Sequence, residues 1–245
     1  MNNFYRIISV FCLIGLLICQ ETKLEKKLTI LRSIDDKSSF AVKNLSTSEI
    51  PLNKSKSQIS WSGGLKFTPK NHTGKIKIIS GYISHDNDTI KGELTIDMNS
   101  MTNTDLSEGA AANLISHLKS DDFFNVSKFK IAKITINEGK FIKKLENGNY
   151  IVLFDADLEI KSIINSVKFQ AEVNMDSNIK TAKGKLRFDR NDFNINYRSE
   201  AYLNDSQTFW NSIESVKSTT KDKVISDEII IDFFIISEES EMLER

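Results

Sequence analysis

The feature that most constrains the fold of this chain is an alternation of apolar and polar residues that returns in segment after segment from about residue 57 onward. The clearest example runs from Ile90 to Asn99. Its even-numbered positions carry Ile, Gly, Leu, Ile and Met, whereas its odd-numbered positions carry Lys, Glu, Thr, Asp and Asn. Because successive side chains of a strand point to opposite faces of a sheet, this pattern predicts an antiparallel strand with one buried face.

Further segments repeat the pattern along the chain. Residues 150–160, 167–175 and 182–188 alternate in the same way, and residues 228–237 are apolar almost throughout. Asn147-Gly148 predicts a tight hairpin turn before the first of these segments. Counting the weaker segments, about eight strands are expected, and closing them into a barrel buries their apolar faces without leaving exposed edges. A barrel of about eight strands is either filled by side chains or able to hold one slender ligand.

Helix is expected in one place only. Asp105 is a candidate N-cap for residues 106–118, in which Ala110, Leu114 and Leu118 are spaced at i, i+4. The chain has only 2 Pro and 10 Gly among its 245 residues, and Ile, Phe, Thr, Ser and Asn recur, as in extended strands joined by polar turns. The predicted class is therefore all-β, an eight-stranded antiparallel barrel with one short helix at about 105–118.

Charge and motifs argue against several classes of function. Lys and Arg together number 33, as do Asp and Glu, so the formal net charge is zero. A chain without net positive charge does not attract nucleic acid, and nucleic acid is not expected as a partner. The three histidines, His72, His85 and His117, lack the spacing of metal ligands, and neither a metal nor a cofactor is expected. The nucleophile elbow, the dinucleotide fingerprint and the P-loop are absent from the sequence. The sequence therefore does not predict an enzyme.

The chain begins with a segment typical of an exported protein. Residues 7–18 are uncharged and strongly apolar, and they end at Cys19. This run is shorter than the about 20 residues that a membrane-spanning helix needs, and it matches the core of a signal peptide. We expect a signal peptide over residues 1–18, with an uncleaved anchor as the alternative.

Leu16-Leu17-Ile18-Cys19 resembles a bacterial lipobox, in which the Cys becomes the lipidated first residue of the mature protein. Ile18 stands directly before the Cys, where such signals usually have Gly, Ala or Ser. The expectation is an envelope lipoprotein, exported and held to a membrane at Cys19. Since the other cysteine, Cys12, lies inside the signal peptide, the mature chain has no second thiol for a disulfide or a thiolate metal site. Residues 19–48 are then a polar tether, unless the aliphatic residues of 28–34 pack on the domain.

Several phrases of the chain, in this order, resemble the YceI-like family. They are Ser60-Trp61-Ser62-Gly63, His72-Thr73-Gly74, the strand 92–100, the helix-to-loop phrase 114–126, Leu158-Glu159-Ile160-Lys161-Ser162, Asp189-Arg190-Asn191-Asp192-Phe193 and Asp227-Glu228. The helix-to-loop phrase is the most specific of them. Ser162 and Asn194 stand where the family usually has Gly, and residues 128–130 stand where a Pro is common. The resemblance covers about residues 50–236, which places the barrel domain at 49–240 and leaves 241–245 as a tail.

The resemblance implies a lipocalin-like barrel in the periplasm or envelope that holds a polyisoprenoid or another long-chain amphiphile and catalyses no reaction. A barrel lined by the apolar strand faces would remove an alkyl chain from water. The residues expected to bind the ligand are Leu94, Ile96, Met98, Phe154, Leu158, Phe169, Val173, Leu186 and Phe188.

Alternatives remain open at this point. The same apolar residues could fill a solid core, in which case the barrel would be an envelope scaffold or stress-related module whose loops bind an unknown protein partner. An enzyme acting on a lipid-like substrate would need titratable groups converging inside the barrel. His72, His117, Asp189 and Arg190 are candidates either for polar groups near the barrel mouth or for turns and caps.

Overall fold

The computed structural model describes residues 49–68, 71–86, 89–199 and 223–239. The predicted signal peptide, Cys19, the tether up to residue 48 and the tail 241–245 lie outside these ranges. The strands are β1 (Glu49–Pro51), β2 (Gln58–Gly64), β3 (Asn71–Asp86), β4 (Thr89–Asn103), β5 (Ile131–Lys144), β6 (Tyr150–Ile160), β7 (Ile163–Asn174), β8 (Thr181–Asp189) and β9 (Glu228–Ile236). The helices are α2 (Glu108–Lys119) and the short 3-10 helix η1 (Arg190–Phe193).

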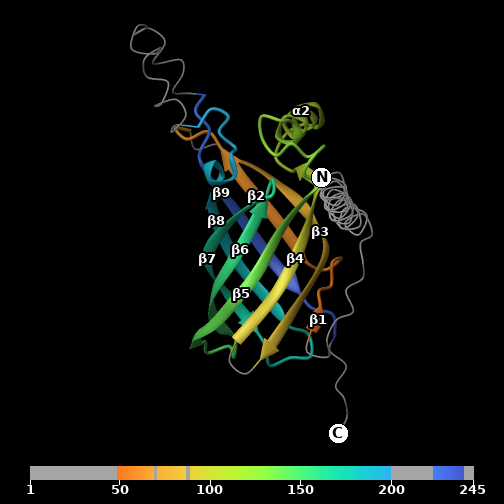
Figure 1. Ribbon diagram of the computed structural model, residues 1–245. Coiled ribbons are helices and arrows are strands. Elements are labelled where there is room, and N and C mark those ends of the chain that lie inside the picture. Colours follow the sequence, from red (N-terminus) through yellow and green to blue (C-terminus); the bar gives the residue numbers. More distant parts are fainter. Residues whose placement is uncertain (1–48, 69–70, 87–88, 200–222, 240–245) are drawn as a thin grey trace, which may run out of the picture. The chain divides into compact units, whose positions relative to one another are not determined.

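The sheet closes on itself into an antiparallel barrel (Figure 1). Its strand order is β1-β3-β2-β9-β8-β7-β6-β5-β4, and an additional pairing of β3 with β4 closes the ring. The short β1 pairs with residues 82–84 of β3, whereas β2 pairs with residues 71–76 of the same strand. β1 and β2 therefore follow one another along the same side of β3 and occupy a single place in the ring. This arrangement confirms the predicted eight-stranded barrel.

The apolar residues of the alternating segments face the inside of the barrel, and the polar residues between them face the outside. In β6, Val152, Phe154, Ala156, Leu158 and Ile160 are buried, while the acidic residues between them are half-buried on the outer face. One outer carboxylate, that of Asp155, lies 3.2 Å from the ammonium of Lys168 on β7. Such exposed pairs contribute little to stability, so burial of the inner face is what holds the strands in register.

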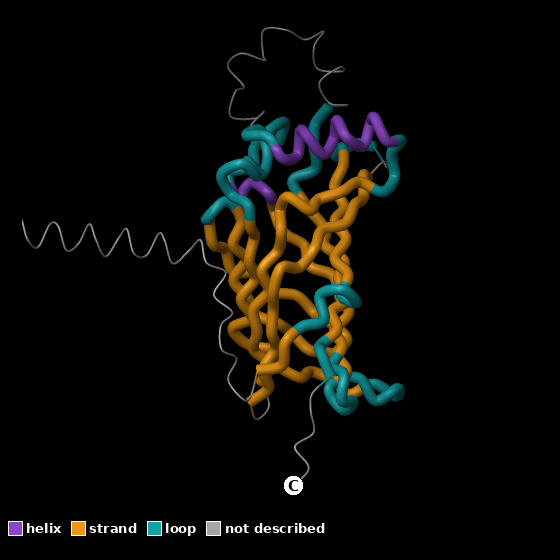
Figure 2. Tube along the Cα trace, turned by 90° about the vertical axis from the view of Figure 1, so that its right-hand side faces the viewer, coloured by secondary structure: helices purple, strands orange, loops and turns teal. Residues whose placement is uncertain are grey.

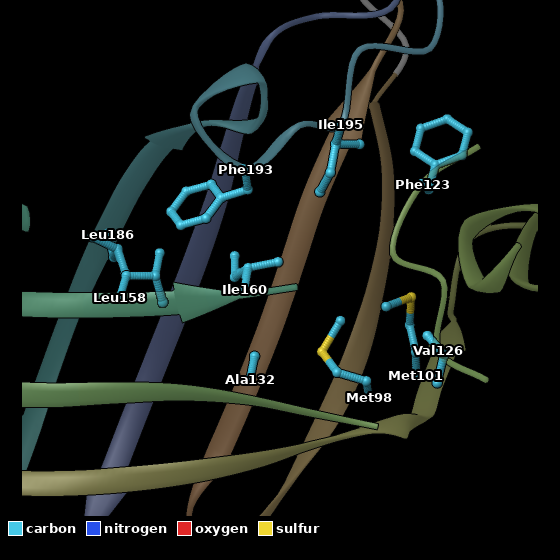
Figure 3. Packing of buried hydrophobic residues seen from close by; sticks show 10 residues of the cluster. All are labelled: Met98, Met101, Phe123, Val126, Ala132, Leu158, Ile160, Leu186, Phe193 and Ile195. Carbon is cyan, nitrogen blue, oxygen red and sulfur yellow. The ribbon is translucent and has the colours of Figure 1, made fainter. Parts of the chain in front are cut away.

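The inner residues form packed clusters along the barrel. The largest lies toward the end that carries α2, and Figure 3 shows its ten buried side chains, which come from β4, β5, β6, β8, the segment before β5 and the segment that begins with η1. A second cluster, Ile90, Val152, Phe154, Ala171 and Val173, lies toward the end where the β5–β6 and β7–β8 turns are found.

The α-helix of the described ranges, α2, lies across the end of the barrel opposite those turns (Figure 2). It runs from Glu108 to Lys119 and confirms the expected short helix, but its N-cap is Ser107 and not Asp105. The reason is that the Asp105 carboxylate accepts hydrogen bonds from the backbone N–H of Thr73 and from Asn103, and so ties the end of β4 to the start of β3. No helix in the described ranges is long and apolar enough to cross a membrane.

Candidate functional site: an apolar cavity in the barrel

The barrel encloses a cavity of about 450 Å³. Aliphatic and aromatic side chains from β2 to β9 line it, together with Leu114 and Leu118 of α2. Several inward-pointing side chains are only half-buried although they point into the barrel: Ile76, Ile96, Ile134, Phe169, Ile231 and Phe233. Since side chains of a solid core would be fully buried, the interior of the barrel is hollow.

Eight of the nine residues expected to bind a ligand line this cavity: Leu94, Ile96, Met98, Phe154, Leu158, Phe169, Leu186 and Phe188. The ninth, Val173, is not part of the lining. It is 3% exposed and packs with Ile90, Val152 and Ala171. The face of β7 is therefore divided between cavity and packed core. Whether the eight residues bind a ligand stays a prediction.

Further lining residues, on β2, β3, β5 and β9, were not among those expected from the sequence. The most prominent are Trp61, Ile76, Ile134, Ile231 and Phe233. Register shifts in β3 between Lys75 and Lys77 and between Ile78 and Ser80 change which positions face inward, so Ile76 and Ile83 both line the cavity although one number is even and the other odd. In β9 both faces are apolar, and alternation cannot distinguish them. Only the Trp61 phrase had been singled out, as a family signature.

Among the described residues, the lining includes three with titratable side chains, namely His72, Lys133 and Arg190. The Lys133 ammonium lies 2.8 Å from a carboxylate oxygen of Glu93, and both residues alternate with cavity-lining neighbours. This pair therefore belongs to the outer face. Within the described ranges there is no group of three or more His, Cys, Asp and Glu residues that could hold a metal ion.

His72 marks the place where the cavity meets the surface. Its side chain lines the cavity and is nevertheless 38% exposed. Its Nδ1 lies 2.9 Å from Oδ2 of Asp105, while Oδ1 of Asp105 accepts from the backbone N–H of Thr73 at 2.8 Å and from Asn103 Nδ2 at 2.6 Å. The Thr73 N–H, followed by His72, lowers the pKa of Asp105 to about 2. At neutral pH Asp105 is therefore an ionised acceptor that orients the imidazole.

Arg190 is buried and is held by the chain itself. Its guanidinium donates to the carbonyl oxygens of Ile195 (2.6 Å), Ser226 (3.0 Å) and Ile225 (3.3 Å), and to Asp227 Oδ1 (3.1 Å). Burial lowers the pKa of Arg190, and the charge of Asp227 opposes that effect. Arg190 therefore joins the segment after β8 to the segment before β9 and closes one side of the barrel end.

The other candidate polar residues have structural contacts. His117 Nε2 lies 3.0 Å from Asp122 Oδ2, and the imidazole meets the rings of Phe123 and Tyr197 edge-on, with centroids 4.9 Å away in both cases. These contacts join α2 to the segment after η1. The Asp189 carboxylate caps η1 by accepting from the backbone N–H of Asn191 at 2.8 Å. Of the four candidates, only His72 combines exposure with a place in the cavity wall.

Comparison with known proteins agrees with this architecture. The family model described as the YceI-like domain matches residues 51–235. The crystal structure of BcnA from Burkholderia cenocepacia is similar, with 18% identity and a TM-score of 0.52, over 76% of this chain and 99% of that one. A polyisoprenoid binding domain from Saccharophagus degradans, implicated in plant cell wall breakdown, has 17% identity and a TM-score of 0.52, over 78% of this chain and 98% of that one. The search of curated proteins found no match.

Proposed function

The chain belongs to the YceI-like domain family, and from this premise we propose that its barrel binds one long-chain isoprenoid or similar amphiphilic lipid and catalyses no reaction. The observation that carries the proposal is the apolar cavity inside the barrel. Its volume of about 450 Å³ lies in the range of about 300–1,000 Å³ that is usual for small-molecule sites. A lipid chain is the ligand class that matches a wall with so few polar groups.

The physical driving force for binding is the removal of hydrocarbon from water. Each buried CH₂ group of a ligand contributes about 0.8 kcal/mol, so a chain that extends along the cavity is bound without any strong polar contact. The naming of the Saccharophagus domain as polyisoprenoid-binding supports an isoprenoid as the first ligand class to test.

A scaffold with a filled barrel was the alternative. The half-buried inner side chains and the cavity favour ligand binding over that alternative. An enzymatic function has less support, because Lys133 is paired on the outer face and Arg190 donates to three carbonyls and to Asp227. Only His72 of the polar lining residues is placed to meet a ligand.

The experiment that tests the proposal is native mass spectrometry of the purified chain, followed by organic extraction and identification of the released compounds. We expect one long-chain apolar compound per chain, bound non-covalently. A chain purified without ligand that also fails to bind added isoprenoids such as geranylgeraniol would overturn the proposal.

We also propose that the protein is an exported lipoprotein anchored in the envelope at Cys19, where the membrane supplies the ligand. The support is the apolar run of residues 7–18 that ends at Cys19. Stable anchoring takes more than one acyl chain, because a single chain binds a bilayer only marginally. Substitution of Cys19→Ser should release the protein from the membrane fraction and remove the acyl mass. Unchanged membrane association and mature mass would show that Cys19 is not the anchor.

A further inference from the structure

We infer that His72 Nε2 accepts a hydrogen bond from a hydroxyl head group, so that the preferred ligands of the cavity are long-chain alcohols. This inference rests on the proposed lipid-binding function and adds the chemistry of the polar end. It also assigns an orientation to the ligand, with the chain inside the barrel and the hydroxyl beside His72 at the surface.

The imidazole proton of His72 lies on the nitrogen that faces Asp105. Asp105 is ionised at neutral pH, because hydrogen bonds from Thr73 and His72 lower its pKa to about 2. A carboxylate can only accept hydrogen bonds, so the His72 nitrogen that lies 2.9 Å from Asp105 Oδ2 carries a proton. In the neutral imidazole the proton is therefore on Nδ1, and Nε2 is an acceptor.

The other ring nitrogen, Nε2, is available to a ligand. Among the described residues none forms a hydrogen bond with this nitrogen, and the ring belongs to the cavity lining. His72 faces Gly63 across the β2–β3 pair, and Gly63 also lines the cavity. A Cβ at Gly63 would lie 3.1 Å from Cδ1 of Ile229, so the Ile229 side chain, which also lines the cavity, covers this position. The His72 ring itself is both part of the lining and 38% exposed, so a small head group of a ligand in the cavity can approach Nε2.

The charges around His72 favour an uncharged head group. The ionised Asp105 lies directly behind His72, and its negative charge disfavours a phosphate or carboxylate at the same place. Of the two cations among the described lining residues, Lys133 is paired with Glu93. The other, Arg190, already donates to Ile195, Ser226, Ile225 and Asp227. An uncharged group that donates one hydrogen bond is the chemistry that fits, and a hydroxyl is the simplest such group.

The experiment compares three ligands that share one chain: geranylgeraniol, its methyl ether and its monophosphate. Their affinities for the full chain are measured by isothermal titration calorimetry at pH 7.5. The ether keeps the oxygen but cannot donate. We expect the alcohol to bind between about two and ten times more tightly than the ether, which is the contribution of one neutral hydrogen bond. The monophosphate is expected to bind more weakly than the alcohol.

Two substitutions assign the effect to His72. His72→Phe keeps a ring but removes Nε2, and it should reduce the ratio of alcohol to ether affinity to about one. Asp105→Asn places an amide N–H in front of Nδ1, which shifts the imidazole proton to Nε2 and should also remove the preference. The matched control is His85→Phe, on the same strand but absent from the cavity lining, and it should keep the wild-type ratio.

Each outcome has a definite meaning. Equal affinity of the wild-type chain for alcohol and ether, tighter binding of the phosphate, or a preference that survives both His72→Phe and Asp105→Asn would overturn the assignment of the head group while leaving lipid binding intact. Failure of all three ligands to bind would overturn the proposed function itself. If His72→Phe does not fold, as judged by circular dichroism, the result with Asp105→Asn decides.

Discussion

Two consecutive residues in the left-handed backbone conformation join β6 to β7. They are Lys161 and Ser162, with φ angles of 54° and 61°. Two consecutive residues with positive φ are typical of the type I′ hairpin, in which glycine is preferred at the second position because it has no Cβ. Ser162 is also a position where the family usually has Gly. The sequence departure therefore coincides with backbone strain.

We predict that Ser162→Gly stabilises the barrel by about 0.5–1 kcal/mol, because it relieves the cost of a left-handed non-glycine residue. Urea denaturation followed by circular dichroism would measure the change. The control is Gly148→Ala in the β5–β6 turn, where φ is 87° and the substitution should destabilise the protein. A destabilised Ser162→Gly variant would mean that the serine side chain, and not the backbone, determines this turn.

Asp105 makes stability depend on pH in the acid range. Its pKa is about 2 in the folded protein and about 3.9 in an unfolded chain. A carboxyl group whose pKa is lower in the folded than in the unfolded chain stabilises the fold at pH values above the unfolded pKa. This stabilisation is lost as the pH falls toward the folded pKa. We predict that urea midpoints measured between pH 4 and pH 2 decline less steeply for Asp105→Asn than for the wild-type chain. Parallel declines would contradict the role given to Asp105.

At the scale of elements, one arginine joins two chain segments. Arg190 at the start of η1 is 1% exposed and donates to carbonyl groups in the segment before β9. A lysine cannot replace it, because the three N–H donors of an ammonium share one nitrogen, whereas the guanidinium of Arg190 donates from three nitrogens to four acceptors. The end of the barrel near η1 therefore depends on this side chain more than on any surface ion pair.

We predict that Arg190→Met costs about 3–5 kcal/mol, because it leaves buried carbonyls and Asp227 without their donor. Hydrogen exchange should become faster at residues 224–227 than elsewhere in the barrel. The matched control is Arg187→Met on β8, which breaks a pair with Glu228 whose side chains are 51% and 52% exposed and should cost about 0–1 kcal/mol. Equal costs for the two substitutions would show that the Arg190 contacts are not specific.

At the scale of the whole barrel, the interior has a hollow part and a packed part, and a tryptophan introduced into each should have opposite effects. Ile134 is half-buried and lines the cavity, whereas Val173 is packed among Ile90, Val152 and Ala171. We predict that Ile134→Trp abolishes lipid binding at a small cost in stability, because its ring occupies the space of the ligand. Val173→Trp should cost about 1–3 kcal/mol or more by overpacking and should keep the ligand.

Both variants are compared with the wild-type chain by native mass spectrometry and by urea denaturation. Loss of ligand from a folded Val173→Trp variant, together with full retention in Ile134→Trp, would mean that the ligand lies in a different part of the barrel from the cavity.

The sequence by itself determined the class of fold and the apolar character of the interior. Alternation is a local property of the chain, so the strands 90–98, 150–160 and 182–188 could be assigned without knowledge of their neighbours. Closure into a barrel followed because long strands with one apolar face must bury that face. Eight of nine residues expected in the ligand site line the cavity for the same reason.

Only the tertiary structure decided which apolar residues face empty space and which are packed. Phe169 and Val173 belong to one face of β7, yet Phe169 lines the cavity and Val173 does not. Register shifts in β3 moved the inward face from one set of positions to the other. Asp105 does not cap the helix as expected. Its carboxylate forms hydrogen bonds with Thr73 and His72, which are more than thirty residues away in sequence. These features depend on contacts between segments that are distant in sequence, and the local alternation of residues cannot predict such contacts.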